Sequence, residues 1–168
     1  MVRWLLIVAI LAAGAFFGYQ RFFSEEGHVR QTLSVVETCF HKEKPETEAE
    51  ARARVHELAE RLAPGCCIEI PEGTYKTVLN EKTLEPMLAV FRKYCRSTFF
   101  SFEDVDIQLT DATTARVTGD LFFQGHIGAF GFDGRDARAF TATLRRDGKT
   151  GVWRFTAIRF DPIIRKFA

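Results

Sequence analysis

The sequence lacks the motifs that mark the common metal, nucleotide and hydrolase sites. It contains no H-x-x-x-H pair and no paired C-x-x-C, which are the usual spacings of zinc ligands. It has no Ser-centred elbow of the G-x-S-x-G type and no glycine-rich loop of the kind that cradles phosphates. We therefore expect neither a metal ion nor a cofactor.

An excess of charge of one sign is also missing. The sequence has 23 Lys and Arg residues against 22 Asp and Glu residues, for a net charge of +1, and no basic run with interleaved aromatic residues. Binding to nucleic acid depends on such a basic patch. Nucleic acid is therefore excluded as an expected partner.

Apolar residues, by contrast, are plentiful. They make up 46% of the chain, and 17 residues are Phe against 2 Trp and 3 Tyr. This content is enough for a core and argues against disorder. The Phe residues indicate either a Phe-packed core or an apolar cavity or contact surface.

The N-terminus has the composition of a membrane anchor. No charged residue lies between Arg3 and Arg21, and residues 4–20 would form a helix about 26 Å long at 1.5 Å per residue. That length is slightly below the roughly 30 Å of the hydrocarbon core. We expect a single transmembrane helix within residues 1–23 and a separate domain over residues 24–168.

Two other interpretations of this segment remain open. Ala13–Ala15 offers an A-x-A site at which a signal peptide could be cleaved, and a soluble cytosolic protein is the third interpretation. Because the N-terminal flank is short, we expect a domain outside the cytoplasm (periplasmic), held to the cell membrane by residues 4–23. Arg21 and Arg30, counted against Arg3, argue mildly for the opposite orientation.

Three amphipathic helices are predicted after the anchor. Each carries apolar residues at the spacing of one helical face. Pro64-Gly65 ends the second helix and Thr83 caps the third. The predicted helices are Ser24–His41, Thr47–Ala63 and Thr83–Cys95, and the short strands Cys66–Ile70 and Thr74–Leu79 form a hairpin before the third helix.

Four consecutive strands are predicted in the C-terminal half. β-branched and aromatic residues alternate there with polar ones, which is typical of an antiparallel sheet with one buried face. The buried set includes Leu109, Val117 and Phe140. Helices followed by strands indicate an α+β domain with the helices on one face of the sheet. The predicted strands are Phe99–Leu109, Thr114–Gln124, Arg135–Arg146 and Val152–Phe160.

The alternation slips once in the first and once in the last of these strands. Phe100 and Phe102 are out of phase with Val105, and Phe155 is out of phase with Ile158. A β-bulge in each strand would explain the slips and would curve the sheet.

The order of these elements resembles the nuclear transport factor 2-like (SnoaL/ketosteroid-isomerase-like) superfamily. The resemblance covers about residues 25–162. It rests on the third helix leading into Phe99–Leu109 and on the last hairpin, Arg138–Phe155, which reads RAFTATLRRDGKTGVWRF. It implies a cone-shaped fold, in which a curved antiparallel sheet wraps around about three helices.

The resemblance also implies a pocket at the wide end of the cone. The pocket or its lid is expected to involve Phe130, Phe132, Phe91, Tyr94 and Trp153. Isomerase-type members of the superfamily place a Tyr on the first helix and carboxylates on strands that face the cavity. This sequence departs from that pattern, since its first helix has no Tyr.

The weak catalytic candidates are Asp104, Asp120 and His126. A carboxyl group would need to be desolvated in a pocket to act as an acid or base, yet Asp120 falls on the polar side of its strand. His126 lies in the predicted connection Gly125–Gly134, where it could belong to a lid or simply be an exposed loop residue.

The four cysteines leave several pairings open. Cys66 and Cys67 are poor partners for each other, because neighbouring strand residues point to opposite faces. Outside the cytoplasm, Cys39 and Cys95 could each pair with one of this doublet, or a single bridge could form. Buried reduced thiols are the alternative.

These observations favour a membrane-anchored, non-enzymatic domain that binds a small apolar ligand or a protein. The protein partner could be a second copy that contacts the sheet face. One alternative is a scaffold subunit of a cell-envelope complex, which the resemblance also allows. The other is a small-molecule isomerase or dehydratase that uses the pocket of the cone.

Overall fold

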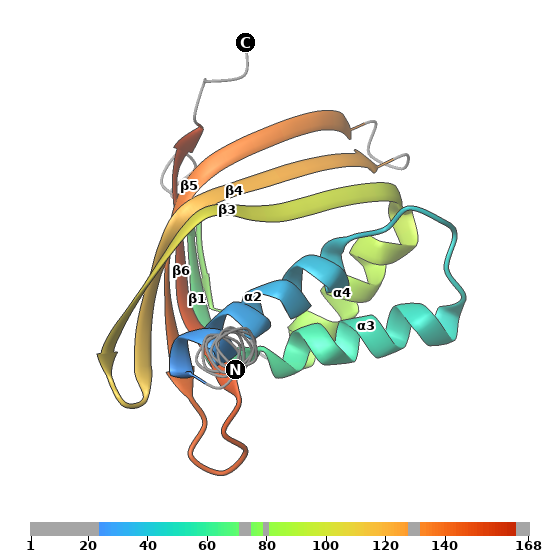
Figure 1. Cartoon of the computed structure of the whole chain (residues 1–168). Coiled ribbons are helices and arrows are strands. Elements are labelled where there is room, and N and C mark those ends of the chain that lie inside the picture. The colour runs from blue at the N-terminus through green and yellow to red at the C-terminus, as the bar shows by residue number, and fades with distance from the viewer. Residues whose placement is uncertain (1–23, 71–74, 79–80, 128–131, 164–168) are drawn as a thin grey trace, which may run out of the picture.

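The computed structural model describes residues 24–70, 75–78, 81–127 and 132–163. No helix in these ranges is long and apolar enough to cross a membrane, and the predicted anchor, residues 1–23, lies outside them. The described chain folds into three helices and one six-stranded sheet (Figure 1). The elements are α2 (Glu25–Phe40), α3 (Glu48–Glu60), β1 (Leu62–Ile70), β2 (Tyr75–Val78), α4 (Glu81–Tyr94), β3 (Cys95–Asp111), β4 (Thr114–Ile127), β5 (Phe132–Arg146) and β6 (Trp153–Ile163).

The sheet has the strand order β2-β1-β6-β5-β4-β3. The four C-terminal strands form the predicted meander, each antiparallel to the next. β1 joins the meander at its far side, parallel to β6 and antiparallel to β2. The antiparallel sheet predicted for the four C-terminal strands is confirmed. The early hairpin, which the sequence did not assign to this sheet, extends it through the parallel pairing of β1 with β6.

Local side-chain contacts explain where the first two helices begin. The Ser24 hydroxyl accepts a hydrogen bond from the backbone of Gly27 at 3.0 Å. Thr47 and Glu50 form a capping box at the start of α3, with the Glu50 carboxylate accepting from the Thr47 backbone at 2.8 Å. These caps satisfy backbone N–H groups that have no partner within the helix.

Two predicted boundaries are wrong. α3 ends at Glu60, and Pro64 and Gly65 lie inside β1 at an irregularity in its pairing with β6. Gly65 has φ +80°, a conformation that glycine adopts at low cost. Thr83 does not cap α4, which begins at Glu81.

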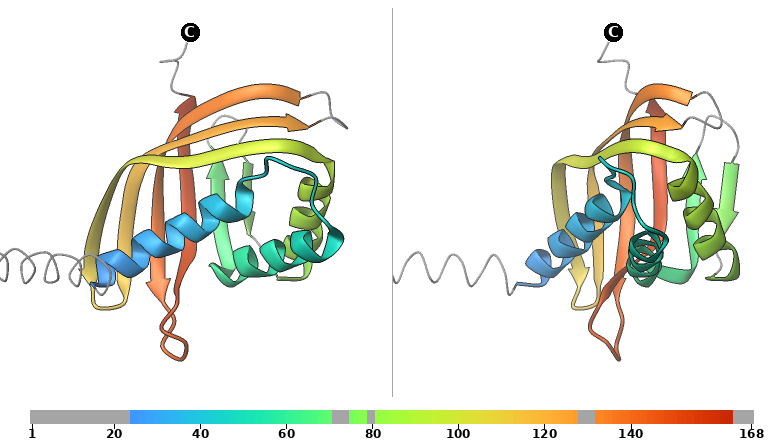
Figure 2. Two further views of the ribbon diagram at one scale, coloured as in Figure 1. Left: turned by 45° about the vertical axis from the view of Figure 1, so that its right-hand side comes forward. Right: turned by 90° about the vertical axis from the view of Figure 1, so that its right-hand side faces the viewer.

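Both predicted bulges are present. In β3, Asp104 and Val105 together oppose Gly119, and Asp104 has φ +49°. In β6, Thr156 is the extra residue, because Phe155 pairs with Leu144 while Ala157 pairs with Thr143. The strands consequently curl around the helices (Figure 2).

The core lies between the concave face of the sheet and the helices. Trp153, Phe140 and Phe155 are its largest fully buried side chains, and Val29 of α2 is completely covered. Leu109 was expected on the buried face but is 47% exposed. It lies two residues before the end of β3, next to the hairpin turn, where the strand pair reaches into solvent.

The β3 bulge generates a stability prediction at Gly119. A Cβ atom there would lie 2.8 Å from the Glu103 carbonyl oxygen and 3.2 Å from the ring of Phe140. The Glu103 oxygen belongs to the backbone and cannot move aside as a side chain can. We therefore expect Gly119→Ala to lower the free energy of unfolding by about 1–3 kcal/mol. Urea denaturation of the two proteins measures the difference.

The matched control is Gly148→Ala. No atom lies within 4 Å of a Cβ at that position, and Gly148 is exposed. This substitution should change the stability by less than about 0.5 kcal/mol. If both substitutions changed the free energy of unfolding equally, the close contact between Gly119 and the Glu103 backbone at the bulge would be contradicted.

Candidate functional site

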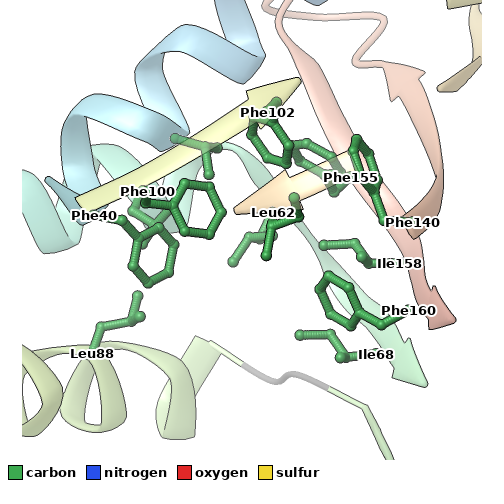
Figure 3. Close-up of a pocket in the computed structure, with 13 residues that line it drawn as sticks. Phe40, Leu62, Ile68, Leu88, Phe100, Phe102, Phe140, Phe155, Ile158 and Phe160 are labelled. Atoms are coloured by element: carbon green, nitrogen blue, oxygen red, sulfur yellow. The ribbon is translucent and has the colours of Figure 1, made fainter. Parts of the chain in front are cut away.

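An apolar cavity lies between the helices and the concave face of the sheet. Its volume is about 150 Å³, and thirteen apolar side chains line it (Figure 3). Every described element except β2 contributes at least one of them. They are Val36, Phe40, Leu58, Leu62, Ile68, Leu88, Phe100, Phe102, Leu121, Phe140, Phe155, Ile158 and Phe160.

Aromatic rings form one continuous side of this cavity. Phe40 stacks on Phe100 with ring centroids 4.9 Å apart, and Phe100 meets Phe102 edge to face at 5.1 Å. Phe102 in turn contacts Phe140 at 5.0 Å. Stacked and edge-to-face pairs are favourable for aromatic rings, and all three centroid distances fall in the favourable range. The ring contacts thus hold α2, β3 and β5 together around the cavity.

The lining has a simple chemical character. None of the thirteen side chains can donate a proton, accept one or bind a metal ion. An apolar cavity of about 150 Å³ is of the kind that stays dry and accepts a benzene-sized molecule. The described lining therefore recognises shape and apolar surface.

Neither of the two carboxylate candidates lies in the described lining of this cavity. Asp104 is exposed at the β3 bulge. Asp120 lies on the face of β4 opposite the cavity-lining Leu121 and is half-buried there. His126 belongs to β4, where its backbone pairs with Ser97 and Asp133, so its expected place in a loop is wrong; its side chain lies outside the described set.

Three of the five predicted pocket residues are not in the described lining of the cavity. Phe91 contacts the rings of Phe40 and Phe123 at 5.8 and 6.4 Å, and Tyr94 is 42% exposed. Trp153 is fully buried, and its indole N–H donates to Glu25 at 3.2 Å.

For the other two predicted pocket or lid residues, the structure does not describe the side chains. Phe130 lies outside the described residues. Phe132 begins β5 as far as its backbone is concerned, and its side chain is outside the described set.

A polar pair that the sequence analysis did not single out borders the cavity. Arg138 pairs across the strands with the lining residue Leu121, and Asp136 pairs with Phe123. The Arg138 Nε lies 2.7 Å from Asp136 Oδ2. Their position could have been predicted from the sequence, because alternation with period 2, counted back from Phe140, places both residues on the concave face.

A second buried charge has a structural role. The Arg92 side chain is 4% exposed; it pairs with Glu46 and donates to the backbone carbonyl of Cys39. Lys42 donates to the carbonyls of Arg92 and Cys95 at 2.7 and 2.8 Å. These contacts fix the end of α4 against the end of α2.

The four cysteines are free thiols. Of the alternatives that the sequence left open, the structure therefore has reduced thiols and not a bridge. Burial raises the pKa of Cys39 to about 11, with a further contribution from the Glu57 carboxylate. Burial also raises the pKa of Cys66 to about 11, and it raises that of Cys95. Cys67 is half-buried. The arrangement is that of reduced thiols in a core.

Known structures with this fold are numerous, although the sequence itself matches none closely. No protein-family model and no curated protein matches it. A candidate scytalone dehydratase from Novosphingobium aromaticivorans is 13% identical, with a TM-score of 0.61 over 88% of this chain and 86% of that one.

Two more solved structures are similar over most of their length. The hexachlorocyclohexane dehydrochlorinase LinA-type3 from Novosphingobium barchaimii is 12% identical, with a TM-score of 0.60 over 84% of this chain and 90% of that one. The Kfla4162 protein from Kribbella flavida is 10% identical, with a TM-score of 0.64 over 84% and 94%. The described domain thus has the nuclear transport factor 2-like fold implied by the sequence resemblance.

The thiol environments generate a labelling prediction. At pH 8, iodoacetamide should modify Cys67 first, and Cys39 and Cys66 at least roughly a hundredfold more slowly, because the thiolate is the nucleophile and is scarce in a buried thiol of raised pKa. Mass spectrometry of the folded chain over time gives the order. Denatured, unreduced protein should take up four labels, and a smaller number would show a bridge.

Proposed function

We propose that this chain is a membrane-tethered, non-catalytic domain that binds a small apolar molecule inside its cone. The observation that carries the proposal is the cavity of about 150 Å³, whose lining among the described residues consists of thirteen apolar side chains. Such a lining gains affinity from removing apolar surface from water and from dispersion contacts.

The size of the cavity sets the expected affinity. A benzene-sized ligand that buries about 200 Å² of apolar surface gains about 5 kcal/mol at roughly 25 cal/mol per Å². This corresponds to a dissociation constant of roughly 0.2 mM. The site suits a hydrophobic metabolite or signal that is present at such concentrations in or near a membrane.

The membrane tether rests on the sequence. Residues 4–20 carry no charge, and α2 begins at Glu25 immediately after the cap residue Ser24. A helix anchored through residues 4–23 would therefore hold the domain close to the lipid surface. We propose that the domain lies on the outer side of the cell membrane.

The enzyme alternative has less support. The similar structures include a dehydrochlorinase and a candidate dehydratase, but the described lining of this cavity offers no group that moves a proton. Because one fold hosts many functions, the function has to be inferred from the site and not from the fold. This site favours binding over turnover.

A second function, contact with a protein through the sheet, is favoured by one observation. Phe99 is 45% exposed on β3 and lies 5.9 Å from the ring of Phe122 on the neighbouring strand. His41 meets the Phe99 ring edge to face at 5.7 Å. A second copy of the chain or a subunit of an envelope complex could cover this aromatic patch.

Filling the cavity should weaken ligand binding. Ile158 lines the cavity and is half-buried, so we expect Ile158→Trp to weaken the binding of toluene at least about tenfold. Methyl chemical shifts of Leu121 in the full chain, titrated with toluene, report occupancy of the cavity itself. The control Leu109→Trp changes an exposed position of the same sheet and should leave the affinity unchanged. Equal affinities in all three proteins would refute the cavity as the binding site.

The tether predicts where the chain is found after cell fractionation. The full chain should sediment with membranes and resist extraction by alkaline carbonate, whereas Ile10→Arg, which adds a charge to the centre of the apolar segment, should release a substantial fraction. The control Lys149→Arg keeps the charge of an exposed turn residue and should sediment normally. Recovery of the unmodified full chain in the soluble fraction would contradict the tether.

A further inference from the structure

The concave face of β5 changes from apolar to polar beside the cavity. Phe140 lines the cavity, and the next two residues on the same face toward the start of the strand are Arg138 and Asp136. Arg138 lies between the lining residue Leu121 on β4 and Ile163 on β6. The pair therefore faces the interior of the cone at the border of the apolar lining.

These two charged groups are held together and largely covered. The Arg138 Nε donates to Asp136 Oδ2 at 2.7 Å, and the side chains are 17% and 30% exposed. The arginine thus occupies one carboxylate oxygen and fixes the direction of the other.

The second oxygen of Asp136 has no partner. Asp136 Oδ1 is buried and makes no hydrogen bond; it is the one carboxylate oxygen in this state among the described residues. A buried acceptor on a charged group that receives no hydrogen bond is costly. Asp136 Oδ1 can therefore accept a hydrogen bond from a donor outside the protein, either water or a ligand that extends from the neighbouring cavity.

The chemistry of the pair restricts that donor. A ligand carboxylate would meet the negative charge of Asp136, and a ligand ammonium would meet the positive charge of Arg138, so both are disfavoured. An uncharged hydroxyl donates to Asp136 Oδ1 without either repulsion. Its apolar body would at the same time fill the space next to Leu121 and Phe140.

We propose that the natural occupant of the cavity is an uncharged, mostly apolar molecule with a hydroxyl group, and that this hydroxyl donates a hydrogen bond to Asp136. Arg138 is a positioning residue that holds the carboxylate in place. This inference rests on the proposed function. It adds the chemical class of the ligand, and it names Asp136 as the residue that distinguishes this ligand from a plain hydrocarbon.

The test compares toluene with benzyl alcohol, which differs from it by one hydroxyl. Both are titrated into the full chain, with the methyl shifts of Leu121 and Ile158 as the readout and the free probe concentration measured at each point. The quantity of interest is the ratio of the two dissociation constants. We expect Asp136→Ala to change this ratio at least about tenfold in favour of toluene, because the hydroxyl loses a charged acceptor.

Two further variants keep the result interpretable. Asp136→Asn preserves the shape of the side chain and an oxygen acceptor but removes the charge, so it should give an intermediate ratio and remains informative if Asp136→Ala fails to fold. Asp106→Ala removes an exposed carboxylate from β3 and should leave the ratio unchanged.

Each outcome has one meaning. A ratio that is the same in the unmodified chain, Asp136→Ala and Asp136→Asn overturns the hydroxyl proposal while leaving the apolar binding site intact. An equal change in Asp106→Ala overturns it as well, because the effect would not be local. Failure of both probes to shift the Leu121 and Ile158 methyl groups of the unmodified chain overturns the proposed function itself.

Discussion

The curvature of the sheet is the constraint on which the rest of the structure depends. Extra residues on β3 and β6 relative to the strands beside them contribute to it, among them those at Asp104 and at Thr156. An extra residue on one strand bends it and increases its twist. The curved sheet has a concave face on which three short helices pack (Figure 2). Gly119 is required at the tightest point of this arrangement.

The concave face has two chemical regions. Its deep part is apolar and aromatic and encloses the cavity, whereas the neighbouring part of β5 presents the pair Asp136 and Arg138. The helices close over the deep part because Arg92 and Lys42 tie α4 to the end of α2 through backbone carbonyls. A cavity survives there because the rings that meet at its walls pack against one another rather than filling the centre.

Much of the fold could be predicted because alternation and helical spacing are local signals. The four long strands, the three helices and the two bulges all follow from the phase of residues such as Phe102 and Val105 within one strand. The boundary at Pro64-Gly65 could not be predicted in this way, because the pair reads as a stop signal, whereas the chain passes through it into a strand that docks beside β6. The pairing of that strand depends on residues about ninety positions apart.

The sequence by itself determined the class of this domain, its curved sheet and the apolar character of its interior, since each depends on the order and polarity of neighbouring residues. Only the tertiary structure decided which apolar residues line a cavity and which merely pack. Phe91 and Trp153 sit on apolar faces as Phe40 and Phe102 do, yet only the latter two reach the open space. It also decided that Asp136 rather than Asp104 or Asp120 faces inward beside that space. The reason is that a cavity is defined by side chains from eight elements meeting at one point, and no local pattern encodes where they meet.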